Sequence, residues 1–173
     1  MTSTEIEQVF HHCFAHTRLM GGAREPLYLP GTEETPARIY YREDFAASAL
    51  HEVAHWCIAG AARRSQVDFG YAYLPPPRDQ QTQHRFFKLE LKAQALESVF
   101  AQAAGVRFHI SADNPEPLDM DAQTKARAEA KFAHQLAAAA AEARQWLLRP
   151  AGRRAGLFYA ALNDTACSNG AAG

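Results

Sequence analysis

Apolar residues recur at helical spacing in three long stretches of the chain. The stretches run from Phe45 to Gly60, from Leu89 to Ala104 and from Asp121 to Leu148. Apolar positions three and four apart share one face of a helix, so each stretch predicts an α-helix with a buried side. The same pattern predicts shorter helices from Glu5 to Phe14 and from Arg154 to about Asn163.

Other segments indicate extended or irregular structure. Glu25–Pro30 is predicted as a short extended segment and Ala37–Tyr41 as a strand. Val67–Tyr73 alternates with a period of two, which is typical of a strand or an extended edge. Gly21–Gly22 is interpreted as a break in the chain, and the polar stretch Arg78–His84 as irregular. The pattern as a whole predicts an α+β fold, a small sheet packed with helices.

Length and composition fit one globular domain. The chain has 173 residues, of which 47% are apolar and 21% charged, and these fractions are ordinary for a folded protein. We expect a single catalytic domain over residues 1–165. The last residues, 166–173, are small and polar and are expected to form a disordered tail.

Charge and cysteine content indicate which classes of partner and which cellular compartment to expect. The net charge of −1 gives no basic surface for direct nucleic-acid binding, and no run of 18 apolar residues predicts a membrane helix. The N-terminus lacks the basic and apolar regions of a signal peptide. The three cysteines, Cys13, Cys57 and Cys167, form no C-x-x-C pair, which favours reduced thiols in a cytoplasmic protein; Cys57 is expected to be a buried apolar residue.

The most informative candidate chemistry lies in the helix that starts near Phe45. Residues 51–55 read HEVAH, an H-E-x-x-H motif in which His51 and His55 share one helical face and can bind one metal ion. Such a five-residue motif arises by chance in roughly one chain in 40 of this composition. The residues around it must therefore indicate whether it binds a metal. Asp44 is expected to cap this helix, and Arg63 and Arg64 to lie near its last carbonyls. Burying two histidines and a glutamate in a helix is costly unless they interact with partners, and a shared metal ion would be such a partner. In the alternative interpretation, His51 and His55 are core residues that bond to the backbone, and Glu52 is solvated.

A two-histidine site needs a further ligand from another element. Glu90 opens the second apolar helix and is the first choice, with Glu97 on the same face as the second. His84 would instead give a three-histidine site, which favours hydrolysis. Because metal–oxygen bonds are about 2.0–2.2 Å and packed cores rearrange little, a Glu90 carboxylate more than about 6 Å from both imidazoles would count against it.

Several separate blocks around this motif resemble the elongation factor P hydroxylase family. The likeness covers roughly residues 2–112, although Ala93 stands where the family usually has proline and the C-terminal third is less similar. The blocks that carry it are Glu25–Pro30, the HEVAHWCIAG stretch within Ser48–Gly60, Ala62–Arg64, Val67–Tyr71, Arg78–Gln83, Glu90–Leu96 and Ala103–Gly105.

The resemblance implies a cytoplasmic enzyme that hydroxylates the β-lysyl-lysine of elongation factor P with molecular oxygen. It implies a fold like that of a three-histidine endoribonuclease of rRNA maturation, and a non-haem iron site with His51, His55 and, carried over with them, Glu90 as ligands. Such a two-histidine, one-carboxylate set leaves open positions where Fe(II) can bind O₂. Glu52 would then orient a ligand or a bound water, whereas beside zinc it would be a general base.

The substrate of that family is cationic, so acidic residues near the metal would help to receive it. Candidates from the sequence are Glu43, Asp44, Asp68 and Glu97, each of which could equally be a cap or a surface charge. Tyr71, Tyr73 and Arg78 are candidates to dock a partner protein or to pack an edge strand.

Two rival functions stay open at this level. A zinc metallopeptidase also uses H-E-x-x-H, but the longer H-E-x-x-H-x-x-G-x-x-H signature is absent from the sequence. A protein that uses the metal only structurally would normally close the site with four ligands, often cysteines, and no cysteine is well placed here.

Overall fold

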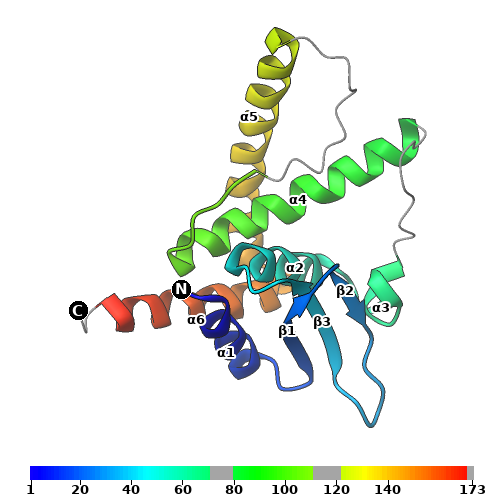
Figure 1. Ribbon diagram of the computed structural model, residues 1–173, viewed down its shortest axis with the longest axis vertical. Coiled ribbons are helices and arrows are strands. Elements are labelled where there is room, and N and C mark those ends of the chain that lie inside the picture. Colours follow the sequence, from blue (N-terminus) through cyan, green and yellow to red (C-terminus); the bar gives the residue numbers. More distant parts are fainter. Residues whose placement is uncertain (71–79, 111–121, 171–173) are drawn as a thin grey trace.

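The computed structural model describes residues 1–70, 80–110 and 122–170. Within these ranges the chain forms six α-helices, three strands and two short 3₁₀ segments (Figure 1). In chain order these are α1 (Ser3–Cys13), β1 (Thr17–Ala23), β2 (Leu27–Leu29), β3 (Ala37–Arg42), α2 (Ala46–Ile58), α3 (Ala61–Arg64), η1 (Val67–Gly70), α4 (Gln80–Ala104), α5 (Ala122–Leu147), η2 (Pro150–Gly152) and α6 (Arg153–Gly170). The α+β prediction is confirmed.

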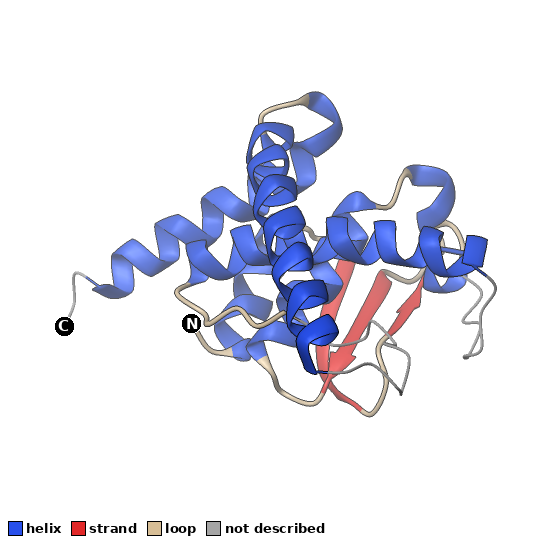
Figure 2. Ribbon diagram, turned by 90° about the horizontal axis from the view of Figure 1, so that it is seen from above, coloured by secondary structure: helices blue, strands red, loops and turns tan. Residues whose placement is uncertain are grey.

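The three strands form one small mixed sheet in the order β1-β3-β2 (Figure 2). The central strand β3 pairs in parallel with β1 and antiparallel with β2. Its residues Ala37, Ile39 and Tyr41 are buried, and the residues between them are exposed or half-buried. One face of the sheet therefore faces the core, as the alternation of side chains along a strand requires.

Helix α2 lies between the sheet and α4, and this position explains its composition (Figure 1). Its residues Ala49, Leu50, Val53 and Ala54 have no exposed surface. A helix covered on two sides needs apolar residues around most of its circumference, so a single amphipathic stripe would not suffice. Helices α1 and α6 flank this stack, and α5 packs on α4. In the described part of the chain, no helix combines the length and apolarity that crossing a bilayer requires.

The capping residue predicted for the N-terminal end of α2 is wrong, whereas an arginine contact predicted for its C-terminal end is confirmed. The N-cap residue is Phe45, no side chain bonds to the free amides there, and the predicted Asp44 cap is wrong. At the other end Arg64 Nη1 donates to the Ala59 carbonyl at 2.5 Å, so its predicted position near the last carbonyls is confirmed. Arg63 Nη1 instead donates to the Phe69 carbonyl at 3.4 Å.

Strand β1 was not predicted, because Gly21–Gly22 was interpreted as a break. Both glycines lie inside the strand, where the register with β3 shifts between Met20 and Ala23. Gly22 has a φ of 81°, a conformation that glycine adopts without steric cost. The glycine pair thus makes an irregularity in a strand rather than its end, which is a common role of glycine in sheets.

The predicted strand Val67–Tyr73 is wrong over its described part. Residues Val67–Gly70 form a 3₁₀ segment in which Asp68, Phe69 and Gly70 all have positive φ. Phe69 is buried and stacks on Tyr28 of β2, with ring centroids 4.2 Å apart. Burial of this aromatic ring, together with the hydrogen bond from the Tyr28 amide to Asp68, holds a backbone conformation that non-glycine residues rarely adopt.

Two helices are longer than predicted. Helix α4 begins at Gln80, so the irregular structure expected up to His84 is wrong from Gln80 onward; glutamine and arginine favour helix even without an apolar stripe. Helix α6 runs to Gly170, so the disordered tail expected from residue 166 is wrong over 166–170, and residues 171–173 lie outside the described ranges. Within the extended part, the hydroxyls of Thr165 and Ser168 donate to the carbonyls of Ala161 and Asp164, four residues earlier.

Candidate metal centre

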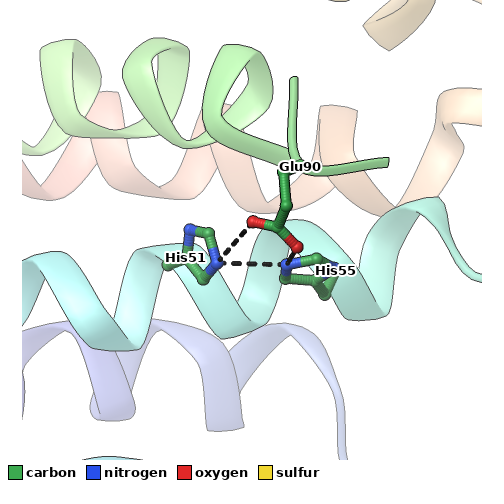
Figure 3. Close-up of side chains that lie close together, drawn as sticks. All are labelled: His51, His55 and Glu90. Atoms are coloured by element: carbon green, nitrogen blue, oxygen red, sulfur yellow. Dashed lines mark hydrogen bonds and ion pairs between the residues drawn. The ribbon is translucent and has the colours of Figure 1, made fainter. Parts of the chain in front are cut away.

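The two motif histidines lie one turn apart on the face of α2 that meets α4. Their Nε2 atoms are 3.0 Å apart, and their rings meet edge to face (Figure 3). Both side chains are largely buried. The i,i+4 spacing of His51 and His55 therefore brings two imidazole nitrogens to one point, as the sequence predicted.

Glu90 reaches the same point from α4. Its Oε1 lies 3.4 Å from His55 Nε2, and its Oε2 lies 3.6 Å from His51 Nε2 (Figure 3). Both distances fall well inside the limit of about 6 Å set for a metal-ligating carboxylate. Within the described residues, His51, His55 and Glu90 form the one group whose potential ligand atoms all lie within 4.8 Å of one another.

Glu97, the second choice as ligand, approaches the opposite side of the His51 ring. Its Oε2 lies 2.8 Å from His51 Nδ1, and the residue is only 4% exposed. A carboxylate accepts hydrogen bonds, so Nδ1 carries the proton that it donates. This contact leaves His51 Nε2 directed at His55 and Glu90, the arrangement in which an outer carboxylate orients a metal-binding imidazole.

The spacing of the three donors suits a single metal ion. Two donors that each bind an ion at about 2.1 Å are about 3.0 Å apart at a right angle and about 3.4 Å apart at a tetrahedral angle. The two imidazole nitrogens are 3.0 Å apart, and each lies 3.4 or 3.6 Å from a different oxygen of the Glu90 carboxylate, so the separations lie close to these values. Two imidazoles and one carboxylate are also the donor types that zinc and non-haem iron accept. The residues thus fit a divalent transition metal.

The electrostatics of the cluster favour a cation. Burial by itself lowers the pKa of His51, but the hydrogen bond with Glu97 and the negative charges of Glu52, Glu97 and Glu90 outweigh it and raise that pKa to about 9. Burial raises the pKa of Glu52, with contributions from Glu90 and Asp68, while the two histidines oppose this rise. Several carboxylates thus converge on two imidazoles, and positive charge, whether a proton or a metal, is stabilised between them.

Glu52 lies beside the cluster but outside the set of three ligand atoms. It follows His51 directly on α2 and is half-buried. Among the acidic residues considered for a cationic substrate, Asp68 accepts the Tyr28 amide at 2.8 Å and contributes negative charge at Glu52. Glu43 and Asp44 are exposed in the turn before α2. The structure therefore places Asp68 near Glu52 and the other two on the surface.

Four further residues from the sequence lie where the structure gives no side-chain information. Tyr71, Tyr73 and Arg78 fall in residues 71–79, and the side chain of His84 is also outside the described set. Their proposed roles stay predictions. Cys57, in contrast, is described: it is buried, burial raises the pKa of its thiol to about 12, and its expected role as an apolar packing residue is confirmed.

Arg154 on α6 is a supporting residue that the sequence did not reveal. Its Nη2 donates to the carbonyls of Trp56, Cys57 and Ala59 at 3.3, 2.9 and 2.7 Å. Its guanidinium also lies 4.9 Å from the centroid of the Trp56 ring. These contacts supply partners for the last carbonyls of α2, which otherwise lack them. Almost 100 residues separate Arg154 from α2, so no local pattern could have indicated the contact.

Comparison with known proteins identifies the family of the chain. The model of the elongation factor P hydroxylase family matches residues 7–164, which include every element from most of α1 to most of α6. The chain is 48% identical over 114 residues to the elongation factor P lysine hydroxylase of Haemophilus influenzae, a match that covers 64% of each chain. The family model extends beyond the region where the sequence blocks were recognised and takes in α5 and most of α6. The chain belongs to the elongation factor P hydroxylase family.

Proposed function

We propose that this protein hydroxylates the β-lysylated lysine of elongation factor P in the cytoplasm. The observation that carries the proposal is the convergence of His51, His55 and Glu90, from two helices, in a chain that belongs to this family. The family name specifies hydroxylation of elongation factor P, and the cluster supplies donors for the metal that such a reaction needs. The modification would take place after translation of the factor and would support its work in protein synthesis.

The proposed metal is Fe(II), held by His51 Nε2, His55 Nε2 and a Glu90 oxygen. When bound by two neutral imidazoles and one carboxylate, iron keeps open positions and a net positive charge, and it supplies the activation of O₂. Zinc accepts the same donors and would make Glu52 the general base of a hydrolase. Membership in a hydroxylase family favours iron over this alternative.

The residues around the cluster have distinct proposed roles. Glu97 holds the proton of His51 on Nδ1 and so keeps Nε2 available. Glu52 orients a bound water or a ligand, and its carboxylate together with that of Asp68 forms an acidic wall beside the cluster. A cationic amino group of the substrate is favoured next to such a wall, because opposite charges within a few ångströms attract strongly in a partly buried site.

The proposed substrate is a folded protein and not a free amino acid. Metal ligands His51 and Glu90 retain 20% and 16% side-chain exposure, so the cluster lies near the surface. Enclosed pockets are typical of sites for small ligands, whereas a shallow site suits a side chain presented by a protein surface. Tyr73 and Arg78 are proposed to contact that surface, which makes a transient interface of modest area.

Intact-mass measurement of β-lysylated elongation factor P tests the function. After incubation with the iron-loaded enzyme in air, the factor should gain the mass of one oxygen atom. His51→Ala should abolish the gain, and His134→Ala, a change of an exposed histidine on α5, should leave it intact. Unchanged mass with the unaltered enzyme, under reducing conditions with iron bound, would contradict the proposal.

A further inference from the structure

The segment that follows α2 and α3 contains a turn whose backbone conformation needs support. Asp68 and Phe69 are consecutive and both left-handed, with φ and ψ of 47° and 35° for the first and 57° and 23° for the second. Residues with a side chain rarely adopt this conformation, and it persists only where the surrounding contacts hold it. Such conformations are concentrated at functional sites. A residue that holds this turn is therefore a candidate for a role in the reaction.

Tyr28 of β2 contacts this segment in three ways. Its amide donates to Asp68 Oδ1 at 2.8 Å, and its ring stacks on Phe69, with centroids 4.2 Å apart and planes inclined by 17°. Its hydroxyl donates to the Arg64 carbonyl at 2.8 Å, which fixes the chain just before the turn. Arg63 adds one bond, from Nη1 to the Phe69 carbonyl at 3.4 Å. Most of the printed support for the left-handed turn thus comes from one buried tyrosine.

The pairing of the sheet explains why the Tyr28 amide is available to Asp68. Tyr28 lies opposite Ile39 in the antiparallel pair of β2 and β3, and its amide bonds to Asp68 and not to β3. Because β2 is an edge strand, an amide that points away from β3 has no partner within the sheet. The Asp68 carboxylate supplies that partner. The edge of the sheet and the turn after α3 therefore fix each other.

Asp68 connects this turn to the metal cluster. Its negative charge adds to that of Glu90 at Glu52, and its side chain is half-buried. A carboxylate has two oxygens, so one can accept the Tyr28 amide while the other accepts a hydrogen bond from a cationic amino group. In a partly buried site such a charge acts strongly over a few ångströms, so its position matters.

We propose that Tyr28 is a positioning residue for substrate binding: it holds the left-handed turn, and the turn keeps the Asp68 carboxylate near Glu52, where it receives a cationic amino group of the modified lysine. The inference rests on the proposed function and adds the contact that determines where this negative charge lies. Because Tyr28 is buried, it acts through Asp68 and not by touching the substrate.

Kinetics of variants at these two positions test the inference. The kcat and KM for β-lysylated elongation factor P are measured with the iron-loaded protein and a chemical reductant, together with metal content and Tm. Asp68→Asn keeps an oxygen for the Tyr28 amide and removes the charge, whereas Tyr28→Leu keeps the carboxylate and removes the ring that holds the turn. We expect each to raise KM at least about tenfold, with kcat within about twofold of the unaltered enzyme. The double variant should show about the same KM as Asp68→Asn, because effects of residues that act through one another do not add.

Three further variants serve as controls. Tyr28→Phe keeps the ring stack and loses only the hydroxyl, so its KM should stay within about threefold of the unaltered value. Tyr40→Leu is the matched control, since Tyr40 is a half-buried tyrosine on the neighbouring strand β3 that faces the other side of the sheet. Its KM should not change. Phe69→Leu removes the same stack from the partner side and replaces Tyr28→Leu if that variant does not fold.

The outcomes separate the inference from the function on which it rests. A lowered Tm with unchanged KM in Tyr28→Leu would show that Tyr28 only packs the core, and an unchanged KM in Asp68→Asn would show that the charge is not used; either result would overturn the inference. Loss of metal in Tyr28→Leu, or KM effects that multiply in the double variant, would also overturn it, because Tyr28 would then act by another route. In all these cases hydroxylation by the unaltered enzyme still stands. Failure of the unaltered, iron-loaded enzyme to hydroxylate the factor would contradict both proposals.

Discussion

At the scale of single residues, the site depends on which nitrogen of each imidazole faces which carboxylate. Glu97 meets Nδ1 of His51, and Glu90 meets Nε2 of both histidines. The sequence identified all four residues, since the motif marks the histidines and an apolar helix with acidic residues on its face needs partners for them. It could not decide between Glu90 and Glu97, because the two lie seven residues apart on the same helical face. The choice depends on how α4 is positioned along α2, which is a tertiary property.

Loss of either histidine should remove the metal. His51→Ala and His55→Ala each leave two donors, and we expect iron content after anaerobic purification to fall from about one per chain to near zero. The fold should persist, because the core around α2 is formed by apolar side chains. Metal analysis and circular dichroism check both statements, with His134→Ala as the matched control. Full iron occupancy in either variant would rule out the assignment.

Glu97 should tune the metal without binding it. Glu97→Gln keeps a hydrogen-bond acceptor for His51 Nδ1 but removes the charge, and Glu97→Leu removes both. We expect metal affinity to fall about tenfold in the first and up to about a hundredfold in the second. Competition with a chelator measures the affinities, and Glu142→Gln, at an exposed position on α5, serves as the control. A complete loss of metal in Glu97→Gln would instead indicate that Glu97 is itself a ligand.

The metal-free protein should become less stable as the pH rises through the neutral range. The folded pKa of His51 is about 9, above its usual value of 6.5, so protonated His51 stabilises the folded state. That stabilisation, on the order of 3 kcal/mol, is complete below about pH 6.5 and is lost as the pH approaches 9. Thermal unfolding of metal-free protein between these limits should show a falling Tm. His51→Gln should flatten the curve, and a Tm that rises with pH in the unaltered protein would oppose this account.

At the scale of secondary-structure elements, apolar periodicity predicted the helices well and missed features that depend on distant partners. The predicted α2 and α5 match the observed bounds to within about two residues, because each has a long stripe of buried residues. Strand β1 was missed because its glycine pair resembles a chain break and becomes a strand only by pairing with β3. The segment Val67–Gly70 resembles a strand but is bent by the stacking of Phe69 on Tyr28.

Arg154 should matter for stability although it touches no ligand. Its side chain bonds to three carbonyls at the C-terminal end of α2, and hydrogen bonds to charged groups contribute about 1.5–3 kcal/mol. We expect Arg154→Met to lower the free energy of unfolding by about 3 kcal/mol. Urea denaturation checks the value, and the neighbouring exposed Arg153→Met should change it by less than about 0.5 kcal/mol. Equal effects of the two substitutions would show that the carbonyl contacts are not important.

At the scale of the whole molecule, the site exists because α2 is held between the sheet and α4 (Figure 1). The sheet fixes one side of α2, and α4 brings Glu90 and Glu97 to the other. Residues from α6 close the end of the same helix, and the family match over residues 7–164 includes these elements. The sequence could predict which helices are buried, but the stacking order that brings His51, His55 and Glu90 together needed the structure.

The proposed function requires a metal that would be held by His51, His55 and Glu90 and would supply O₂ activation for the hydroxylation of elongation factor P. The most direct measurement uses isotopically labelled O₂ with the iron-loaded protein, a chemical reductant that supplies the two electrons needed to reduce the second oxygen atom to water, and β-lysylated elongation factor P, followed by intact-mass analysis. The account predicts that the factor gains one oxygen atom carrying the label, and that Glu90→Ala, which removes the carboxylate donor, abolishes the gain. A gain of unlabelled oxygen from water, or cleavage of the factor without any gain, would contradict the account and favour a hydrolase.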